Sequence, residues 1–238
     1  RRVGLASGLT AGMRSGGTVV DMSVDALDEP LVILVHGAWH GAWSFAALQA
    51  ELDHRGVPSL AVDLPGHGAS TLPLGDLVGD AAHVVAVVER LARPVILLGH
   101  SYGGAVVTEA AGHTSWARGL VYLAAFALEP GESVRAIGKA LPHQTALDHA
   151  VERRDDGTTV LDPVAAAGAL YAHSPLGVAA AALERVSPQP VVTMQQEVTV
   201  SPRSSMPSTY VVCTLDQAVH PEQQRMMAGR CSRVVELE

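Results

Sequence analysis

A serine at position 101 stands in a five-residue pattern that is typical of activated nucleophiles. The sequence around it reads ILLGHSYGGA (96–105), in which Gly99, Ser101 and Gly103 form G-x-S-x-G after an aliphatic run. Where this pattern joins a strand to a helix, a sharp turn projects the serine hydroxyl out of the sheet. The N-terminus of the helix adds positive potential near a developing oxyanion. We therefore predict that Ser101 is a catalytic nucleophile and not a serine in a plain glycine-rich turn.

A nucleophilic serine needs a general base, and that base needs a carboxylate to orient it. Asp216 ends the apolar run STYVVCTLD (208–216), and folds with parallel strands place their ligands at the carboxyl ends of the strands. Glu129 is the weaker candidate, because it opens the segment after another apolar run instead of ending that run. We predict Asp216 as the carboxylate, against the alternative of an aspartate that only caps a helix.

The histidines do not supply an obvious base. Of the eleven histidines, only His220 follows Asp216, and it stands at the start of the next expected helix, so we interpret it as structural. His100, beside the nucleophile, is expected to point into the packing of the sheet. Three more histidines fall in loops at the same edge: His36, His40 and His67. Each of these would break the chain order of nucleophile, acid and histidine that this arrangement follows.

Two backbone N–H groups are needed to bind the oxyanion of an acyl-transfer intermediate. The residue after the nucleophile, Tyr102, supplies one of them. The loop HGAWHGAW (36–43) follows the apolar run LVILV (31–35), and its His-Gly turn can aim the N–H of Ala38 at the same point. We predict Ala38 and Tyr102 as the oxyanion donors. The residues expected in the pocket wall are His36, Gly37 and His40.

The elements that must position these residues alternate along the chain. Apolar runs predict parallel strands at 31–35, 58–64, 95–99, 119–126, 208–216 and 232–238. Helical spacing of apolar residues predicts helices at 43–56, 76–92, 102–112 and 221–229. This alternation predicts the α/β class, with a mostly parallel, doubly wound sheet.

One segment interrupts the alternation. Residues 128–207 are rich in Ala, Pro and Gly and carry no clear series of strands, but helices are expected at 162–172 and 175–186. We interpret this segment as a helical cap inserted between the two parts of the core, 31–127 and 208–238. Residues 1–30 are interpreted as a leader or N-terminal extension.

Composition narrows the possible partners. The chain has 238 residues, of which 48% are hydrophobic, enough for the core of one domain. Its net charge of −8 argues against nucleic acids and anionic membranes, and no apolar run approaches the ~18 residues that span a bilayer. Two cysteines without C-x-x-C spacing predict reduced thiols and no metal site. A cytoplasmic location is the default, with an N-terminal export signal as the alternative.

Several motifs together resemble those of the α/β-hydrolase superfamily. VHGAWHGAW, VDLPGHG, GHSYGG, LVYLAAF and STYVVCTLDQAVHPEQQRMMA stand in that family's order, and the resemblance covers the chain from about Leu31 to Glu238. The chain is most similar to the branch of small methyl esterases and hydroxynitrile lyases, with its bacterial esterase relatives. The resemblance implies Ser101 as nucleophile, Asp216 as triad acid, and 128–207 as the cap over the substrate pocket. It also places the catalytic histidine a handful of residues beyond Glu238.

The expected function is that of a serine hydrolase, without metal or cofactor, that cleaves a small, largely apolar carboxylic ester. The lyase reading is disfavoured because Gly37 follows His36 where lyases of this branch carry threonine. Epoxide hydrolases and haloalkane dehalogenases carry aspartate at the position of Ser101 and are excluded more firmly. The alternatives are a non-catalytic homologue that binds a small ligand, and a lactonase, thioesterase or lyase on the same fold.

Overall fold

Six parallel strands form the central sheet, in the order β2-β1-β3-β4-β8-β9. The computed structural model describes residues 30–140 and 144–238, so the predicted leader lies outside the described residues except for Pro30. The strands are β1 (Leu31–Val35), β2 (Ser59–Val62), β3 (Val95–His100), β4 (Ala117–Leu123), β8 (Ser208–Cys213) and β9 (Arg233–Leu237). The predicted parallel, doubly wound sheet is confirmed.

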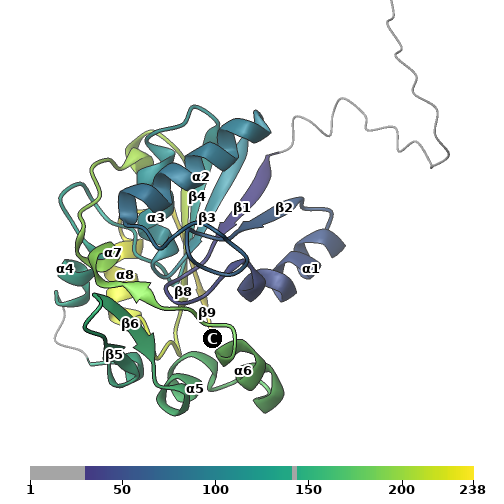
Figure 1. Ribbon diagram of the computed structural model, residues 1–238. Coiled ribbons are helices and arrows are strands. Elements are labelled where there is room, and N and C mark those ends of the chain that lie inside the picture. Colours follow the sequence, from purple (N-terminus) through teal and green to yellow (C-terminus); the bar gives the residue numbers. More distant parts are fainter. Residues whose placement is uncertain (1–29, 141–143) are drawn as a thin grey trace, which may run out of the picture.

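Helices cover both faces of this sheet (Figure 1). On one face lies α1 (Ala46–His54), which follows a short 3-10 helix, η2 (Ala42–Phe45). The other face carries α2 (Leu77–Leu91), α3 (Gly103–Ala111) and α8 (Pro221–Ala228). Alternate residues of β1 serve the two faces: Val32 and Leu34 pack with Phe45, whereas Ile33 and Val35 belong to the larger core. Burial on both faces explains why β1 is a continuous apolar run.

The helices begin where their sequences indicate. The Asp76 carboxylate accepts the N–H of Gly79 at 2.8 Å and caps α2, as its sequence position predicts. Pro221 occupies the first turn of α8, where its missing N–H costs no hydrogen bond. Within the residues that the structure describes, no helix combines the length and the apolar character that crossing a membrane requires.

The segment between β4 and β8 contains more than helices. Its helices are α4 (Val134–Gly138), α5 (Pro163–Tyr171), α6 (Leu176–Leu183) and α7 (Val191–Gln195), with short 3-10 turns η3 (Ala146–His149) and η4 (Pro202–Ser204). A small antiparallel sheet accompanies them, formed by β5 (Val151–Arg153), β6 (Thr158–Leu161) and β7 (Gln189–Pro190). The expectation of a segment without strands is therefore corrected. We call residues 128–207 the insertion.

A tight turn explains the unexpected strands. Between β5 and β6 the chain reverses at Gly157, whose φ of +81° is a left-handed conformation that favours glycine. The Asp156 carboxylate accepts the backbone N–H of Thr158 at 2.9 Å and fixes the turn. An Asp-Gly pair between β-branched and charged residues is a hairpin signal, so the sequence did carry this information.

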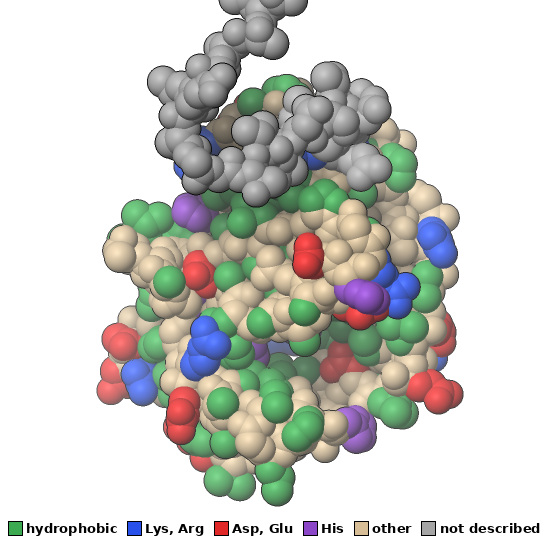
Figure 2. All heavy atoms as spheres, turned by 90° about the vertical axis from the view of Figure 1, so that its right-hand side faces the viewer, with side chains coloured by type: hydrophobic (Ala, Val, Ile, Leu, Met, Phe, Trp, Pro, Cys, Tyr) green, Lys and Arg blue, Asp and Glu red, His purple; other side chains and the backbone are tan. Residues whose placement is uncertain are grey.

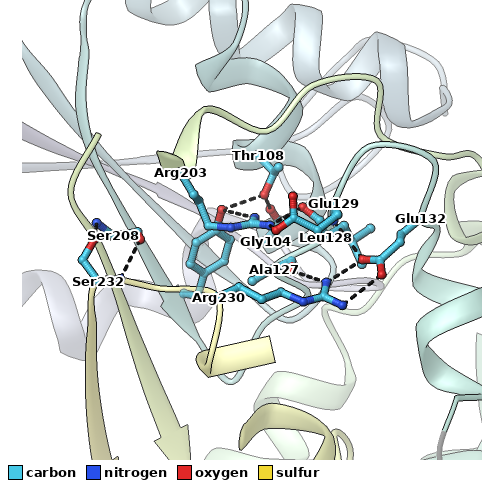
Figure 3. Close-up of polar contacts among 11 residues, drawn as sticks. Gly104, Thr108, Ala127, Leu128, Glu129, Glu132, Arg203, Ser208, Arg230 and Ser232 are labelled. Carbon is cyan, nitrogen blue, oxygen red and sulfur yellow. Dashed lines mark hydrogen bonds and ion pairs between the residues drawn. The ribbon is translucent and has the colours of Figure 1, made fainter. Parts of the chain in front are cut away.

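Arg203 ties the end of the insertion to its beginning (Figure 3). This buried side chain donates to the carbonyl of Leu128 at 2.7 Å and to the Glu129 carboxylate at 2.5 Å. Its other terminal nitrogen donates to the hydroxyl of Tyr122 on β4 at 3.1 Å. Glu129, the weaker candidate for the catalytic acid, is therefore engaged in a structural ion pair.

Arg230, which follows α8, holds the same stretch of chain from the other side (Figure 3). Both of its terminal nitrogens bond to the Glu132 carboxylate, at 2.5 and 2.9 Å, and one also donates to the carbonyl of Ala127 at 3.0 Å. We call Arg203 and Arg230 with their partners the root clamps, because both fix the insertion where it leaves the core.

Candidate active site

Ser101 stands in a strained turn between β3 and α3. Its φ is +51°, a left-handed conformation that non-glycine residues rarely adopt. Hydrogen bonds hold this backbone in place, since the Ser101 carbonyl accepts the N–H groups of Gly104 at 3.0 Å and Phe126 at 3.1 Å. Such strain persists where the surrounding structure enforces it, and it is concentrated at functional sites.

Three glycines make this turn possible. A Cβ atom on Gly99 would overlap the carbonyl oxygen of Gly103, and one on Gly103 would overlap the carbonyl oxygen of Val35. A Cβ on Gly104 would lie 2.8 Å from the Cβ of Ala125. Strand and helix are thus in backbone contact around the serine. The local geometry is that of a nucleophile elbow, as the sequence pattern predicts.

The loop after β1 packs against this elbow. A Cβ on Gly37 would lie 3.0 Å from the Cβ of Ser101, so the two backbones are adjacent. His36 anchors the start of the loop: its Nδ1–H donates to the carbonyl of Gly37 at 2.8 Å, and its Nε2 accepts the N–H of Leu64 at 3.0 Å. We call residues 36–41 the donor loop.

The two predicted oxyanion donors flank the serine. The N–H groups of Ala38 and Tyr102 have no hydrogen-bond acceptor within residues 30–140 and 144–238. Ala38 lies in the donor loop beside Gly37, and Tyr102 follows Ser101 at the start of α3. Two such N–H groups beside a nucleophilic serine can stabilise a negatively charged oxygen, particularly next to a helix N-terminus.

Asp216 lies in the turn after β8, and its carboxylate is held firmly. Its Oδ1 accepts the N–H groups of Ala218 at 2.7 Å and Val219 at 3.1 Å. Its Oδ2 accepts the side-chain amide of Gln224 from α8 at 2.8 Å. Burial raises the pKa of Asp216 above its ordinary value, although these hydrogen bonds act in the opposite direction. The second oxygen retains capacity to accept a further hydrogen bond.

These residues share one cavity of about 1010 Å³. Gly37, Ala38 and Ser101 line it together with Asp216, while α5 and α6 supply the opposite wall. Most of the lining is apolar, from alanine, leucine, valine and tryptophan side chains. Figure 2 shows a hollow in the face of the molecule that it draws, below the middle of the view. With His40 included, the structure therefore brings five of the sequence-predicted residues to one space of a size suited to a small ligand.

Of the histidines considered in the sequence, two have structural roles and two line the cavity. His36 is fully buried and does not line the cavity, unlike the sequence-based expectation, because both its ring nitrogens bond to the backbone. His220 caps α8 by accepting the N–H of Glu222 at 3.2 Å, as interpreted from the sequence. His40 lines the cavity as expected. His100 also lines the cavity, whereas the sequence led us to expect its side chain in the packing of the sheet. Burial lowers the pKa of His100 to about 4.

Two polar contacts of the site were not anticipated. Tyr171 on α5 lines the cavity, and its hydroxyl lies 2.6 Å from Nε2 of His40. Behind the elbow, the hydroxyl of Tyr102 donates to the buried carboxylate of Asp80 at 2.7 Å. Burial raises the pKa of Asp80 to about 7. Neither pairing has a sequence signal, since the partners are joined only by the fold.

The site contains no cluster suited to a metal. In the part of the chain that the structure describes, no three His, Cys, Asp or Glu side chains gather closely enough to hold a metal ion. The polar residues that line the cavity include serines, a tyrosine, histidines and two carboxylates, which are groups that can support nucleophilic and acid–base chemistry.

The parallel sheet, the elbow serine and the acid after β8 together define the α/β-hydrolase fold. The model of the alpha/beta hydrolase family matches residues 32–238. The chain belongs to this family.

Curated and solved relatives refine the placement. The chain is 38% identical over 120 residues to the carbendazim hydrolyzing esterase of Nocardioides sp. (strain SG-4G), a match covering 48% of this chain and 50% of that protein. It is 28% identical over 221 residues to methylesterase 7 of Arabidopsis thaliana, covering 86% and 85%. The crystal structure of the methylesterase MES16 from Arabidopsis matches with a TM-score of 0.72 at 26% identity, covering 88% and 89%. The chain is thus an α/β-hydrolase of the methylesterase branch, and its relatives support ester hydrolysis.

Proposed function

We propose that the protein is a serine hydrolase that cleaves a small, largely apolar carboxylic ester through an acyl-enzyme. One observation carries this proposal: Ser101 stands in a left-handed elbow at the wall of the cavity, with the donor loop packed against it. A serine in a merely structural turn needs neither the strain nor the adjacent N–H groups. The esterase names of the relatives agree with this chemistry.

The reaction has two halves of the same form. Ser101 Oγ attacks the ester carbonyl carbon while its proton passes to the base, and the carbonyl oxygen becomes an oxyanion bound by the N–H groups of Ala38 and Tyr102. The bond to the alcohol oxygen then breaks, and the base returns the proton to the leaving alcohol. Water attacks the acyl-serine by the same route, so that the carboxylic acid leaves and Ser101 regains its proton.

The base in this proposal is the histidine that the family resemblance places in the loop after β9. Glu238, the residue after β9, lines the cavity that Ser101 also lines, so a side chain in that loop would lie next to this cavity. Asp216 would accept the N–H of this histidine, fix its tautomer and stabilise its cationic form. A histidine within the next several codons of the gene is the expected finding. A stop codon directly after codon 238 would contradict this assignment of the base.

The cavity wall supports an apolar acyl or alcohol group. The residues contributed by α5 and α6 include Ala169, Leu170, Val178 and Ala182, which offer dispersion contacts and few hydrogen bonds. Esters with small aliphatic or aromatic groups therefore fit this wall better than highly charged esters do.

The test uses the protein expressed from its complete gene. It should hydrolyse p-nitrophenyl acetate, and Ser101→Ala should lower kcat by at least ~10³-fold, as loss of a triad nucleophile does. Phenylmethylsulfonyl fluoride should modify the Ser101 peptide, detected by mass spectrometry. The matched control is Ser174→Ala, another serine of the cavity wall, which should retain activity. Equal activity of Ser101→Ala and the wild-type protein would refute the assignment.

A further inference from the structure

Four hydrogen-bonding contacts join the donor loop to the insertion. Ser187 donates its N–H to the carbonyl of Trp39 at 2.8 Å, and the N–H of Trp39 donates to Oε1 of Gln189 at 3.2 Å. The indole N–H of Trp39 donates to the hydroxyl of Thr159 at 3.1 Å. The fourth contact joins Tyr171 to His40 at 2.6 Å. All four partners belong to residues 128–207, which lie far along the chain from the loop that they hold.

The protons of the Tyr171–His40 contact can be assigned by chemistry. Nδ1 of His40 lies 2.8 Å from the carbonyl oxygen of Ala38, which can only accept, so Nδ1 carries the proton. Burial lowers the pKa of His40, and the neutral ring therefore has a free lone pair on Nε2. Burial also raises the pKa of Tyr171 to about 12, so its hydroxyl keeps its proton and donates to Nε2. The relay runs from Tyr171 through His40 to the carbonyl of Ala38.

This relay ends on the residue that supplies a proposed oxyanion donor. The carbonyl of Ala38 belongs to the peptide that joins Ala38 to Trp39, and only the two backbone torsions of Ala38 separate this peptide from the one that carries the Ala38 N–H. Holding the carbonyl in place therefore restrains the donor N–H from its C-terminal side. The next residue, Trp39, has a φ of +63°, a left-handed conformation that its own side chain disfavours. A loop in this conformation needs external contacts to keep its shape. The relay is one of them, and it touches the donor residue directly.

We propose that Tyr171 and His40 are positioning residues for ester hydrolysis, through which the insertion sets the oxyanion donor Ala38. The inference rests on the proposed function, because it gives the Ala38 N–H a role in the transition state. The insertion is then part of the catalytic geometry as well as a wall of the pocket. Its contribution is specific to the charged intermediate and small for the bound ester.

The first experiment removes one oxygen atom. Tyr171→Phe, in the protein expressed from its complete gene, should lower kcat for p-nitrophenyl acetate about ten-fold and leave KM within about two-fold. A trifluoromethyl ketone provides a second readout, because Ser101 adds to its carbonyl carbon and the carbonyl oxygen becomes an oxyanion in the donor site. The variant should bind this ketone about ten-fold more weakly, in step with kcat.

Two further variants separate positioning from simple stabilisation. Tyr122→Phe removes the same atom on β4, at a residue that does not line the cavity, and should keep both kcat and ketone affinity even if its melting temperature falls. His40→Phe removes both hydrogen bonds of the relay while keeping a ring against Trp43, and should lower kcat more than Tyr171→Phe does. Adding Tyr171→Phe to His40→Phe should then cause almost no further loss, as expected for residues that act in series.

The outcomes are distinguishable. An active wild-type enzyme whose Tyr171→Phe variant keeps its kcat and its ketone affinity would overturn this inference alone. A raised KM with unchanged kcat would also overturn it, since that pattern indicates a contact with the bound ester. A wild-type protein that neither cleaves the ester nor binds the ketone would overturn the proposed hydrolase function, and the inference with it.

Discussion

The two sides of the candidate site are held in different ways. The elbow around Ser101 is fixed from within the core, by direct backbone contacts at Gly99, Gly103 and Gly104. The donor loop, only one strand away, is anchored at its start by His36, but Trp39 and His40 are held by side chains and backbone of the insertion. Both contain a residue with positive φ, Ser101 at +51° and Trp39 at +63°. The strain is similar, but the elements that sustain it are not.

Because the two sides are held differently, stability and activity should respond differently to changes at each side. The position of Ser101 follows from the packing of β3 against α3, which also stabilises the whole domain. The position of the donor loop also depends on a few hydrogen bonds that come from the insertion. Changes at the elbow should therefore damage stability and activity together, whereas changes at the insertion contacts should affect activity with little loss of stability.

The largest combined loss of stability and activity is expected at Gly103. Gly103→Ala would drive a Cβ into the carbonyl oxygen of Val35 and displace the elbow. We expect the free energy of unfolding to fall by about 3 kcal/mol, measured by urea denaturation, with loss of ester hydrolysis. The control is Gly168→Ala on α5, where an added Cβ meets nothing within 4 Å. That change should stabilise the protein by up to ~1 kcal/mol, because alanine favours the helix. Equal stability of the two variants would contradict the comparison.

The next effect concerns Asp80, whose carboxyl is buried behind the elbow. Because burial raises the pKa of Asp80 to about 7, its stabilising contribution is full below pH ~4 and is lost as the pH rises toward 7. Asp80→Asn removes this dependence. The free energy of unfolding of the wild-type protein, relative to the variant, should fall by roughly 1.4 kcal/mol per pH unit between pH ~4 and 7. Parallel pH profiles of the two proteins, measured by urea denaturation, would show that Asp80 ionises normally.

A smaller effect tests the insertion side. Gln189→Leu removes the acceptor of the Trp39 N–H, so kcat for p-nitrophenyl acetate should fall about ten-fold with KM nearly unchanged. Thr159→Val removes the acceptor of the Trp39 indole and a hydrogen bond to the Gln189 carbonyl, but it should keep kcat within about two-fold because the loop backbone retains its contacts. A Gln189→Leu variant with wild-type kcat would remove the distinction between the two sides.

The smallest effect is expected at the root clamps. Glu132→Gln weakens the ion pair with Arg230, whose charged groups are both partly exposed, and should cost less than ~1 kcal/mol in chemical denaturation. The esterase rate should not change, because this clamp holds the insertion where it leaves the core and has no contact with the donor loop. A large fall in kcat would mean that the roots also position the loop.

Local sequence predicted the parts of the site that local geometry builds. The turn around Ser101 was predictable because three glycines and an apolar strand leave the backbone little alternative. Asp216 was expected at the end of a strand, but β8 ends at Cys213 and Asp216 lies in the turn that follows. His36 was assigned to the pocket wall, yet its ring accepts the backbone N–H of Leu64, which follows β2. This contact depends on how β1 and β2 pair, which the local sequence around His36 does not show. Nothing in the sequence pairs His40 with Tyr171, because their contact depends on how the insertion folds over the sheet.

The strands of the insertion were missed for a different reason. The Asp156-Gly157 turn was a readable hairpin signal, but β5 and β6 are only three and four residues long and lie in an alanine-rich segment. Short strands give too few alternating positions for periodicity to detect. Compositional bias therefore outweighed a correct local signal.

The hydrogen bonds between the insertion and the donor loop have a consequence for exchanging parts among relatives. Grafting another family member's insertion onto this sheet, to import its substrate preference, would also replace the partners of Trp39 and His40. A graft that carries a new wall but no equivalents of Tyr171 and Gln189 would bind the new ester and turn it over slowly. For this chain, the modular unit is the insertion together with residues 36–41.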